Sequence, residues 1–97
     1  MKMLKSLEEL VQIIRERKKT SPNKSYTNKL LNNKKMCTEK VNEEINELLE
    51  AIKKNDNQVH EAADVLYHLL VLLEGSEIKI EDVMQELKKR QNGIRQK

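Results

Sequence analysis

Two pairs of carboxylates in this 97-residue chain are spaced by one helical turn. Glu44 and Glu47 form the first pair, and Glu61 and Asp64 form the second. Residues three apart lie on one face of a helix, so each pair would present two carboxylates to the same point. Four carboxylates without a thiol form a hard ligand set that suits Mg²⁺, with Mn²⁺ as a possible substitute, better than zinc. Mg²⁺ keeps coordination positions for water and substrate phosphates, so the pattern indicates phosphate chemistry.

The surroundings of Glu61 and Asp64 favour a metal site over an ordinary solvated helix face. Acidic residues one turn apart are common on charged helices, so Glu44 and Glu47 alone would not separate the two interpretations. Glu61, Asp64 and His68, however, are the main polar interruptions of a segment that is apolar on nearly all sides. A carboxylate removed from water is costly unless it is paired or binds a cation. Two such groups one turn apart therefore indicate a bound cation.

For the polar residues near these acidic pairs we expect structural roles and not metal binding. We expect His68 to be half-buried and hydrogen-bonded to a neighbour, and Tyr67 to pack in the core or in a dimer interface. His60 falls in the first turn of its helix and is expected to face solvent. Glu43 and Glu50 lie on other sides of their helix, so they are expected to point away from the acidic pairs.

The two acidic pairs fall on successive helices that should form an antiparallel hairpin. The first of these helices is predicted over about residues 38–54, and the second over about residues 58–74. The first carries an apolar stripe made of Val41, Ile45, Leu48, Leu49 and Ile52. Asn55, Asp56 and Asn57 supply a tight turn and an N-cap for the second helix. Because the connection is so short, the two helices are neighbours and both acidic pairs can face one groove.

Flanking elements are predicted on both sides of this hairpin. An N-terminal helix should begin at a capping box over residues 6–9, run to about residue 18 and end at the Pro-containing segment 20–23. Residues 24–35 form a basic, polar segment with room for one or two helical turns but not for a core element. Gly75 is expected to be the C-terminal cap of the hairpin's second helix. A last helix is predicted over about residues 80–91, and the tail over residues 92–97 should fray.

Size, composition and net charge limit the fold class and the partners that this chain can have. A chain of 11.4 kDa has room for one domain, spanning residues 1–97, and the scarcity of Gly, Pro and aromatic residues favours an all-α fold. A net charge of +3 does not argue for nucleic-acid binding, and no apolar stretch is long enough to cross a membrane. The single Cys37 fits a cytoplasmic protein. The helix over 58–74 is too apolar for this small chain to cover, so we expect a homodimer.

At this point the sequence resembles a known family. Glu44-Ile45-Asn46-Glu47, followed after residues 48–60 by Glu61-Ala62-Ala63-Asp64, resembles the ExxE…ExxD signature of the MazG-type, all-α nucleotide pyrophosphohydrolase superfamily. The segment over residues 25–31 is similar to the SYTxKLL segment of the phosphoribosyl-ATP pyrophosphohydrolase family, and residues 61–73 and 80–83 are similar to later parts of that family. Lys24 departs from the usual Gly, Lys79 departs from a common Ser or Thr cap, and residues 33–37 form a diverged connection.

This resemblance implies a bundle of four to five helices around the central antiparallel hairpin, completed by dimerisation. It also implies Mg²⁺-dependent hydrolysis of phosphoribosyl-ATP to phosphoribosyl-AMP and pyrophosphate, the second step of histidine biosynthesis. The implied metal ligands, which are also the implied catalytic residues, are Glu44, Glu47, Glu61 and Asp64.

Further roles follow from the same resemblance. One of the four ligands, or Glu43, would position the attacking water. The implied substrate contacts are Ser25, Tyr26, Thr27, Lys29 and Lys40. The two lysines would bind phosphates, and the three hydroxyl residues would bind the ribose-phosphate end or shape a lid.

Two other functions are compatible with the acidic residues. A housekeeping pyrophosphohydrolase of ordinary nucleoside triphosphates would share the four carboxylates but would not need the segment over residues 25–31. A non-enzymatic helical interaction module would use the acids only to solvate a groove and the apolar helix to associate. An assay of pyrophosphate release separates all three.

Overall fold

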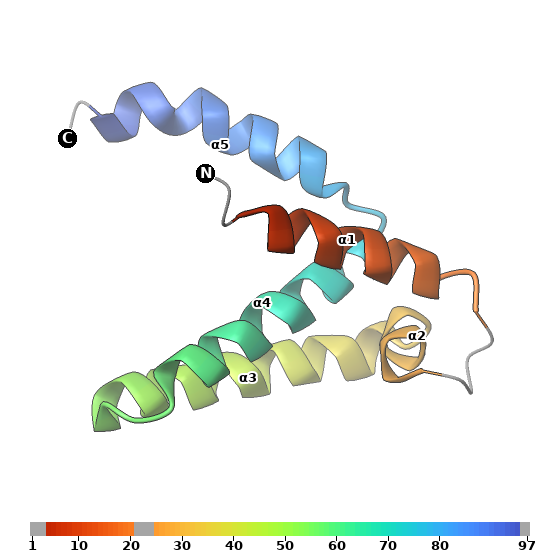
Figure 1. Ribbon diagram of the computed structural model, residues 1–97, viewed down its shortest axis with the longest axis horizontal. Helices are drawn as coiled ribbons and strands as arrows, with labels where there is room; N and C mark the ends of the chain where they lie inside the picture. Colours follow the sequence, from red (N-terminus) through yellow and green to blue (C-terminus); the bar gives the residue numbers. More distant parts are fainter. Residues whose placement is uncertain (1–3, 21–24, 96–97) are drawn as a thin grey trace.

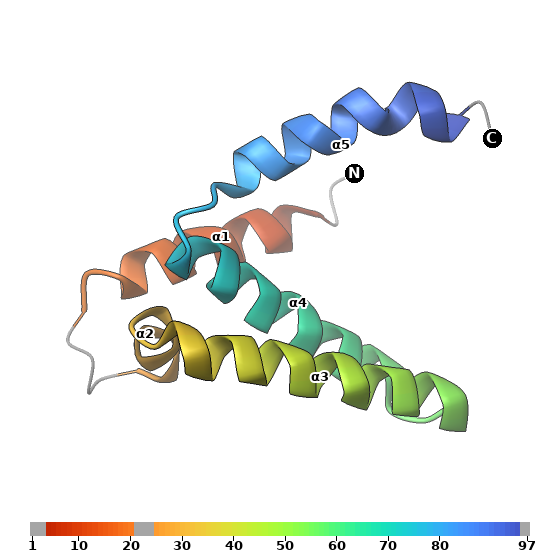
Figure 2. The same cartoon turned by 180° about the vertical axis from the view of Figure 1, so that it is seen from behind.

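The computed structural model describes residues 4–20 and 25–95, and within them it contains five helices and no strand (Figure 1). The helices are α1 (Lys5–Arg17), α2 (Tyr26–Leu31), α3 (Lys34–Lys54), α4 (Gln58–Gly75) and α5 (Ile80–Arg95). α3 and α4 lie side by side as an antiparallel hairpin, α1 packs across α4, and α2 sits beside the start of α3 (Figures 1 and 2). The all-α prediction is therefore confirmed.

The hairpin forms where the sequence predicted it, although its ends differ. α3 begins at Lys34, four residues before the predicted start, because the Asn33 side chain accepts a hydrogen bond from the Met36 N–H at 3.1 Å. The helix ends at Lys54, and Asn55 at its C-cap position takes the left-handed conformation with a φ of 55°. Asn57 is the N-cap position of α4, as predicted, but its φ of 58° prevents the expected side-chain cap. Its amide instead lies 3.4 Å from the Glu61 carboxylate.

The core lies where α1, α2, α3 and α4 meet. Its buried members are Val11, Ile14, Leu30, Cys37, Leu70 and Val71. Leu30 shows that the short helix α2 is a core element, so the prediction that residues 24–35 contain none was wrong.

Asn28 explains why α2 can be buried despite its polar sequence. Its amide donates hydrogen bonds to the carbonyl oxygens of Thr20, at 2.8 Å, and of Arg17. These oxygens lie at and just after the end of α1, where carbonyl groups lack helical partners. A polar side chain thus joins two helices at a place where an apolar one could not.

The start of α1 differs from the prediction, whereas its end lies within one residue of the predicted one. The helix begins at Lys5, so Ser6 lies inside it and the expected capping box does not form. Leu4 occupies the N-cap position without a side-chain hydrogen bond. The helix ends at Arg17, whose carbonyl oxygen accepts a hydrogen bond from the Thr20 hydroxyl at 2.8 Å. Residues 21–24, which include most of the predicted terminating segment, lie outside the described residues.

Gly75 is the last residue of α4 and not its left-handed cap, which corrects the sequence prediction. Ser76 is the cap position, and Glu77 takes the left-handed conformation with a φ of 59°. Gly75 instead lies close to α2, since a Cβ atom there would be 3.4 Å from the carbonyl oxygen of Leu31. The following helix, α5, continues to Arg95, beyond the predicted end at residue 91, and residues 96–97 lie outside the described residues.

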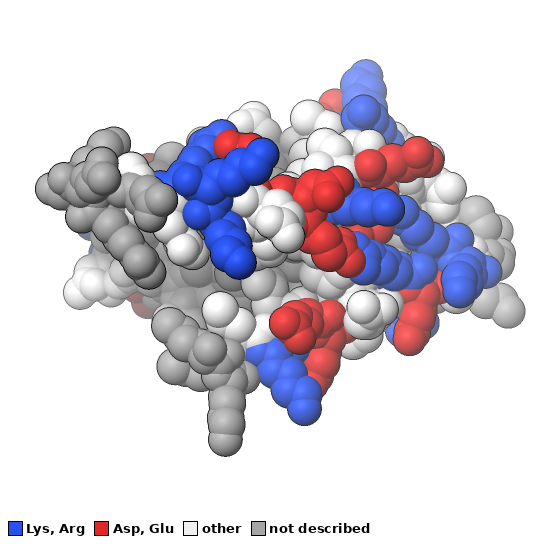
Figure 3. Space-filling model, turned by 90° about the horizontal axis from the view of Figure 1, so that it is seen from above, with Lys and Arg blue, Asp and Glu red and all other residues white. Residues whose placement is uncertain are grey.

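Two surface features complete the fold. On the face seen from above, basic and acidic side chains are interspersed and form no single patch of one sign (Figure 3). Among the described residues, no helix is both long and apolar enough to cross a membrane.

Candidate functional site

The hairpin brings the two predicted acidic pairs together. On α3, carboxylate oxygens of Glu43, Glu44 and Glu47 lie within 4.8 Å of one another. On α4, atoms of His60, Glu61 and Asp64 meet the same limit. Glu47 joins the two groups, because its carboxylate lies close enough to those of Glu44 and Glu61 to raise the pKa of both. The four carboxylates therefore form one continuous acidic cluster across the two helices.

The burial of Glu44 and Glu61 makes this cluster unlike a solvated helix face. Glu44 is only 8% exposed, and its Oε2 atom has no hydrogen-bond partner among the described residues. The Oε2 atom of Glu61 is buried and unpartnered in the same way. Burial, followed by the proximity of Glu47, raises the pKa of both carboxyl groups above the ordinary value. Buried carboxylate oxygens that lack a hydrogen-bond donor are suited to a hard divalent cation.

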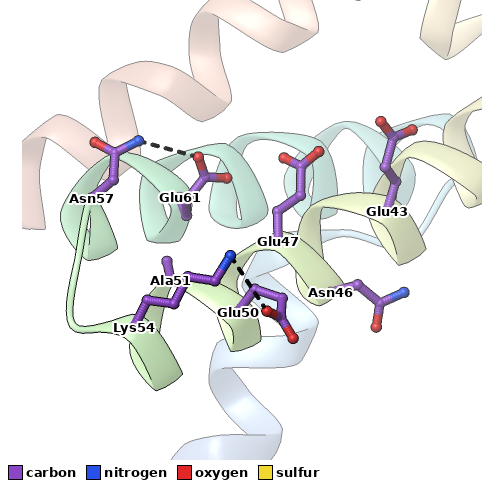
Figure 4. Close-up of a pocket in the computed structure, with 8 residues that line it drawn as sticks. All are labelled: Glu43, Asn46, Glu47, Glu50, Ala51, Lys54, Asn57 and Glu61. Atoms are coloured by element: carbon purple, nitrogen blue, oxygen red, sulfur yellow. Dashed lines mark hydrogen bonds and ion pairs between the residues drawn. The ribbon is translucent and has the colours of Figure 1, made fainter.

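An open groove of about 450 Å³ runs along the hairpin next to this cluster (Figure 4). Its lining residues are Glu43, Asn46, Glu47, Glu50, Ala51, Lys54, Asn57 and Glu61. The carboxylates of Glu43, Glu47 and Glu61 point to one side, whereas Glu50 points elsewhere and pairs with Lys54 at 3.9 Å (Figure 4). Glu50 is thus oriented as predicted.

The predicted orientation of Glu43 was wrong. Its carboxylate turns toward those of Glu44 and Glu47, although its position on the helix is 100° from that of Glu44. Lys40 accounts for this, because its ammonium group lies 3.5 Å from the Glu43 carboxylate, one turn away. The charge of Glu43 raises the pKa of Lys40. The Lys40 ammonium group therefore lies at the rim of the acidic cluster.

The predicted substrate-contact residues of α2 lie in different settings. Ser25 is the N-cap of α2, and its hydroxyl accepts a hydrogen bond from the Asn28 N–H at 2.9 Å. The Thr27 hydroxyl is hydrogen-bonded to the Tyr67 hydroxyl. Both groups are therefore engaged within the protein. The Lys29 side chain is exposed, and no ion pair of it is found within residues 4–20 and 25–95.

Tyr26, on α2, is both exposed and in contact with α4. Its hydroxyl lies 3.0 Å from the Nε2 atom of His68, on α4. Burial raises the pKa of this hydroxyl, and the nearby charges of Lys40 and Glu44 act on it in opposite directions. Tyr26 therefore sits where α2 meets the start of the acidic cluster.

The sequence analysis missed one contact of this cluster. His60 is exposed, as predicted, yet its Nε2 atom lies 3.3 Å from the Asp64 carboxylate. The signal that could have revealed the contact is the spacing of four residues, which places the two side chains on one helix face. His60 thus adds a nitrogen atom to the edge of an otherwise all-oxygen cluster.

Comparison of the sequence with known proteins identifies relatives of this chain. Residues 7–91 match the profile of the family described as phosphoribosyl-ATP pyrophosphohydrolase. A phosphoribosyl-ATP pyrophosphatase of Rhizobium etli is 44% identical, with 95% of this chain and 91% of the relative covered. The phosphoribosyl-ATP pyrophosphatase of Haloarcula marismortui is 43% identical, with 87% and 91% covered.

A longer relative shows the same match within a larger protein. The histidine biosynthesis bifunctional protein of Pyrococcus furiosus is 43% identical over 90% of this chain, which corresponds to 42% of that protein. The family match spans both acidic pairs, α2 and most of α5. This chain therefore belongs to the phosphoribosyl-ATP pyrophosphohydrolase family.

Proposed function

We propose that this chain hydrolyses phosphoribosyl-ATP to phosphoribosyl-AMP and pyrophosphate, the second step of histidine biosynthesis. Membership of the family supports the substrate and the reaction. The observation that carries the proposal is the acidic cluster, in which Glu44 and Glu61 keep buried oxygens without protein partners. A biosynthetic enzyme of this kind would work in the cytoplasm.

Mg²⁺ is the cofactor that fits this cluster best, with Mn²⁺ as a substitute. Glu44, Glu47, Glu61 and Asp64 would hold it. When bound, the cation would neutralise charge on the triphosphate and help to activate water for attack at the α–β phosphoanhydride. The chain's own contribution is to hold four carboxylates close together before substrate arrives, so that little reorganisation is needed.

Other residues would complete the site. Glu43 lies beside Glu44 and Glu47, where its carboxylate could orient the attacking water. Lys40 lies beside Glu43 and would bind a phosphate group of the substrate. Lys29 would contribute a second cation from α2, and residues 25–27 would form the wall nearest the organic part of the substrate.

We also propose that the chain acts as a homodimer. Ile45, Leu49 and Ile52 form an exposed apolar stripe on α3, and Leu49 is 59% exposed. On α4, Leu66 is 51% exposed. Both helices of the hairpin therefore carry apolar surface that a second copy would remove from water.

Pyrophosphate release tests the proposed reaction. Wild type, Glu61→Gln and Glu50→Gln would be assayed with Mg²⁺ on phosphoribosyl-ATP and on ordinary nucleoside triphosphates. We expect wild type and Glu50→Gln to release pyrophosphate from phosphoribosyl-ATP, and Glu61→Gln to lose roughly 100-fold or more in kcat, the scale of removing a charge-stabilising group. Glu50 is the matched control because it lines the same groove but pairs with Lys54.

Each failure of this assay has its own meaning. Release from ordinary triphosphates alone would contradict the histidine assignment and favour a housekeeping enzyme. No release from any substrate would favour a non-enzymatic interaction module. Equal activity of Glu61→Gln and Glu50→Gln would show that the acidic cluster is not the reaction centre.

A further inference from the structure

A cluster of hydroxyl and ring groups joins α2 to α4 next to the acidic cluster, and the proposed reaction gives no role to its two α4 members, Tyr67 and His68. Tyr26 and Thr27 contribute from α2, and Tyr67 and His68 from α4. The Tyr26 and Tyr67 rings stack with centroids 6.5 Å apart, and both rings meet His68 edge to face. His68 is only 6% exposed, whereas Tyr26 remains 47% exposed. The Tyr26 ring therefore lies beside the Tyr67 and His68 rings and keeps considerable open surface.

The hydrogen bonds of His68 define which atom donates. Its Nδ1 atom lies 2.7 Å from the carbonyl oxygen of Asp64, which can only accept, so Nδ1 must carry the proton. In the neutral ring Nε2 is then an acceptor. The Tyr26 hydroxyl, 3.0 Å away, donates to it. The Asp64 carbonyl oxygen thus orients the His68 ring, and the His68 ring orients the Tyr26 hydroxyl.

The position of Tyr26 relates this contact to the substrate. The Tyr26 hydroxyl contacts His68, whose ring contacts the backbone of Asp64, so Tyr26 lies next to the acidic cluster. The charges of Lys40 and Glu44 also act on this hydroxyl. Carboxylates and a cation can bind a polyphosphate, but every nucleoside triphosphate carries one. Discrimination therefore needs a group beside the cluster that contacts the organic part of the substrate. An exposed aromatic ring is suited to stack on a base or to pack against a ribose.

We propose that His68 is a positioning residue, which holds the Tyr26 ring beside the acidic cluster so that this ring binds the organic, non-phosphate part of the substrate. The inference rests on the proposed function and adds to it a determinant of substrate selection. Tyr26 touches the substrate, and His68 acts through Tyr26.

Four single variants and one double variant test this role by steady-state kinetics on phosphoribosyl-ATP. Tyr26→Phe keeps the ring and removes the hydroxyl. His68→Asn keeps a donor near the Asp64 carbonyl but is too short to reach Tyr26, whereas His68→Gln can place an acceptor near the position of Nε2. Leu30→Val is the matched control, because it loosens the core contact of α2 one turn beyond Tyr26 and leaves the hydrogen bond intact.

We expect Tyr26→Phe and His68→Asn to raise KM about three- to tenfold, the range that one net hydrogen bond spans, while kcat changes less than about twofold. His68→Gln should restore most of the KM. The double variant Tyr26→Phe/His68→Asn should be no worse than either single variant, because both remove the same contact. Leu30→Val should lower the melting temperature and leave KM unchanged.

A second measurement examines the geometry directly. Long-range ¹H–¹⁵N spectra of the wild type at neutral pH should show His68 protonated at Nδ1. The Tyr26→Phe substitution should shift the resonance of the His68 Nε2 atom. Protonation at Nε2 would overturn the inference.

The kinetic outcomes separate the inference from the proposed function. An active wild type with an unchanged KM in both variants overturns the inference alone, as does a Leu30→Val variant whose KM rises equally. An inactive wild type would overturn the proposed function and this inference with it.

Discussion

Glu44 and Glu61 each keep one carboxylate oxygen away from water without a partner among the described residues. Such groups cost folding free energy, because a buried charge without compensation loses its solvation. The proximity of Glu47 adds repulsion between like charges. At the residue scale the acidic cluster therefore has the character of a binding site and not of a stabilising contact. A bound cation would offset this cost by linkage between binding and folding.

This cost leads to a prediction for Glu44→Gln. In buffer that contains a chelator, the neutral amide should raise the free energy of unfolding by about 1 kcal/mol, which corresponds to roughly 4–8 °C in melting temperature for a domain of this size. Addition of Mg²⁺ should stabilise wild type and leave the variant nearly unchanged. Differential scanning calorimetry with and without Mg²⁺ measures both effects.

Glu50→Gln is the control for that experiment, because Glu50 is exposed and pairs with Lys54. It should change the free energy of unfolding by less than about 0.5 kcal/mol and should respond to Mg²⁺ as wild type does. A chelated Glu44→Gln protein that melts below wild type would contradict the unpartnered state of the Glu44 carboxylate.

Arg15 connects three helices at the end of the molecule opposite the hairpin turn. Its guanidinium donates to the Glu81 carboxylate of α5 at 2.9 and 2.6 Å, and to Glu74 of α4 at 2.8 Å. Lys18 adds a second ion pair to Glu74 at 3.1 Å. Glu74 is a buried carboxylate at the end of an apolar helix, so it needs these partners. At the element scale, charge pairing therefore helps to dock α5, which has few other contacts with the bundle.

The Arg15–Glu81 contact predicts a pH dependence. Hydrogen bonds from Arg15 lower the pKa of Glu81 from 4.5 to about 2. A lowered folded-state pKa means that this contact contributes stability above pH 4.5 and loses it as the pH falls toward 2. Glu81→Gln should therefore be less stable than wild type at pH 7 and should lose less stability between pH 4.5 and pH 2. Urea unfolding across this pH range measures the difference.

Glu86→Gln is the matched variant, because Glu86 pairs with Arg90 inside α5 and does not reach α1. Glu81 is exposed, so the effect should be small and should shrink in high salt. Identical pH profiles for Glu81→Gln and Glu86→Gln would show that the bidentate contact does not hold α5 in place.

At the scale of the whole molecule, the hairpin exposes large apolar side chains on α3. The stripe of Ile45, Leu49 and Ile52 continues along α3 beside the face that packs on α4. Neither α1 nor α5 covers it, since α1 packs on α2 and α4, and α5 packs on α4. At this scale the proposed homodimer follows from the amount of surface that the five helices leave open.

Leu49→Glu should therefore dissociate the proposed dimer. A two-fold interface would contain the substitution twice, so the dimer dissociation constant should rise roughly 100-fold or more. Sedimentation velocity over a range of concentrations measures this. Ile13→Glu is the control, because Ile13 is similarly exposed but lies on α1. A monomeric wild type, or dissociation by Ile13→Glu alone, would contradict an interface on the hairpin.

The sequence by itself determined the elements whose signals are local. Apolar periodicity and the short Asn-rich turn defined α3 and α4, and their pairing brought Glu44, Glu47, Glu61 and Asp64 together. Motif spacing on those helices also indicated the superfamily, and the residues over 25–31, 61–73 and 80–83 indicated the family. These features can be predicted from the sequence because helical geometry relates the spacing of residues to their position on a helix face. A three-residue turn also leaves only one arrangement of two long helices.

Tertiary structure decided what depends on contacts between distant residues. The burial of α2 requires carbonyl groups at the end of α1 as partners for Asn28, and the orientation of Tyr26 requires His68 on another helix. The turning of Glu43 depends on a flexible ion pair with Lys40. His68 is 42 residues from Tyr26, which it binds, and Asn28 lies on a different helix from Arg17, whose carbonyl oxygen it binds, so no periodicity records either contact. Only the packing of the helices decides which polar side chains come into contact.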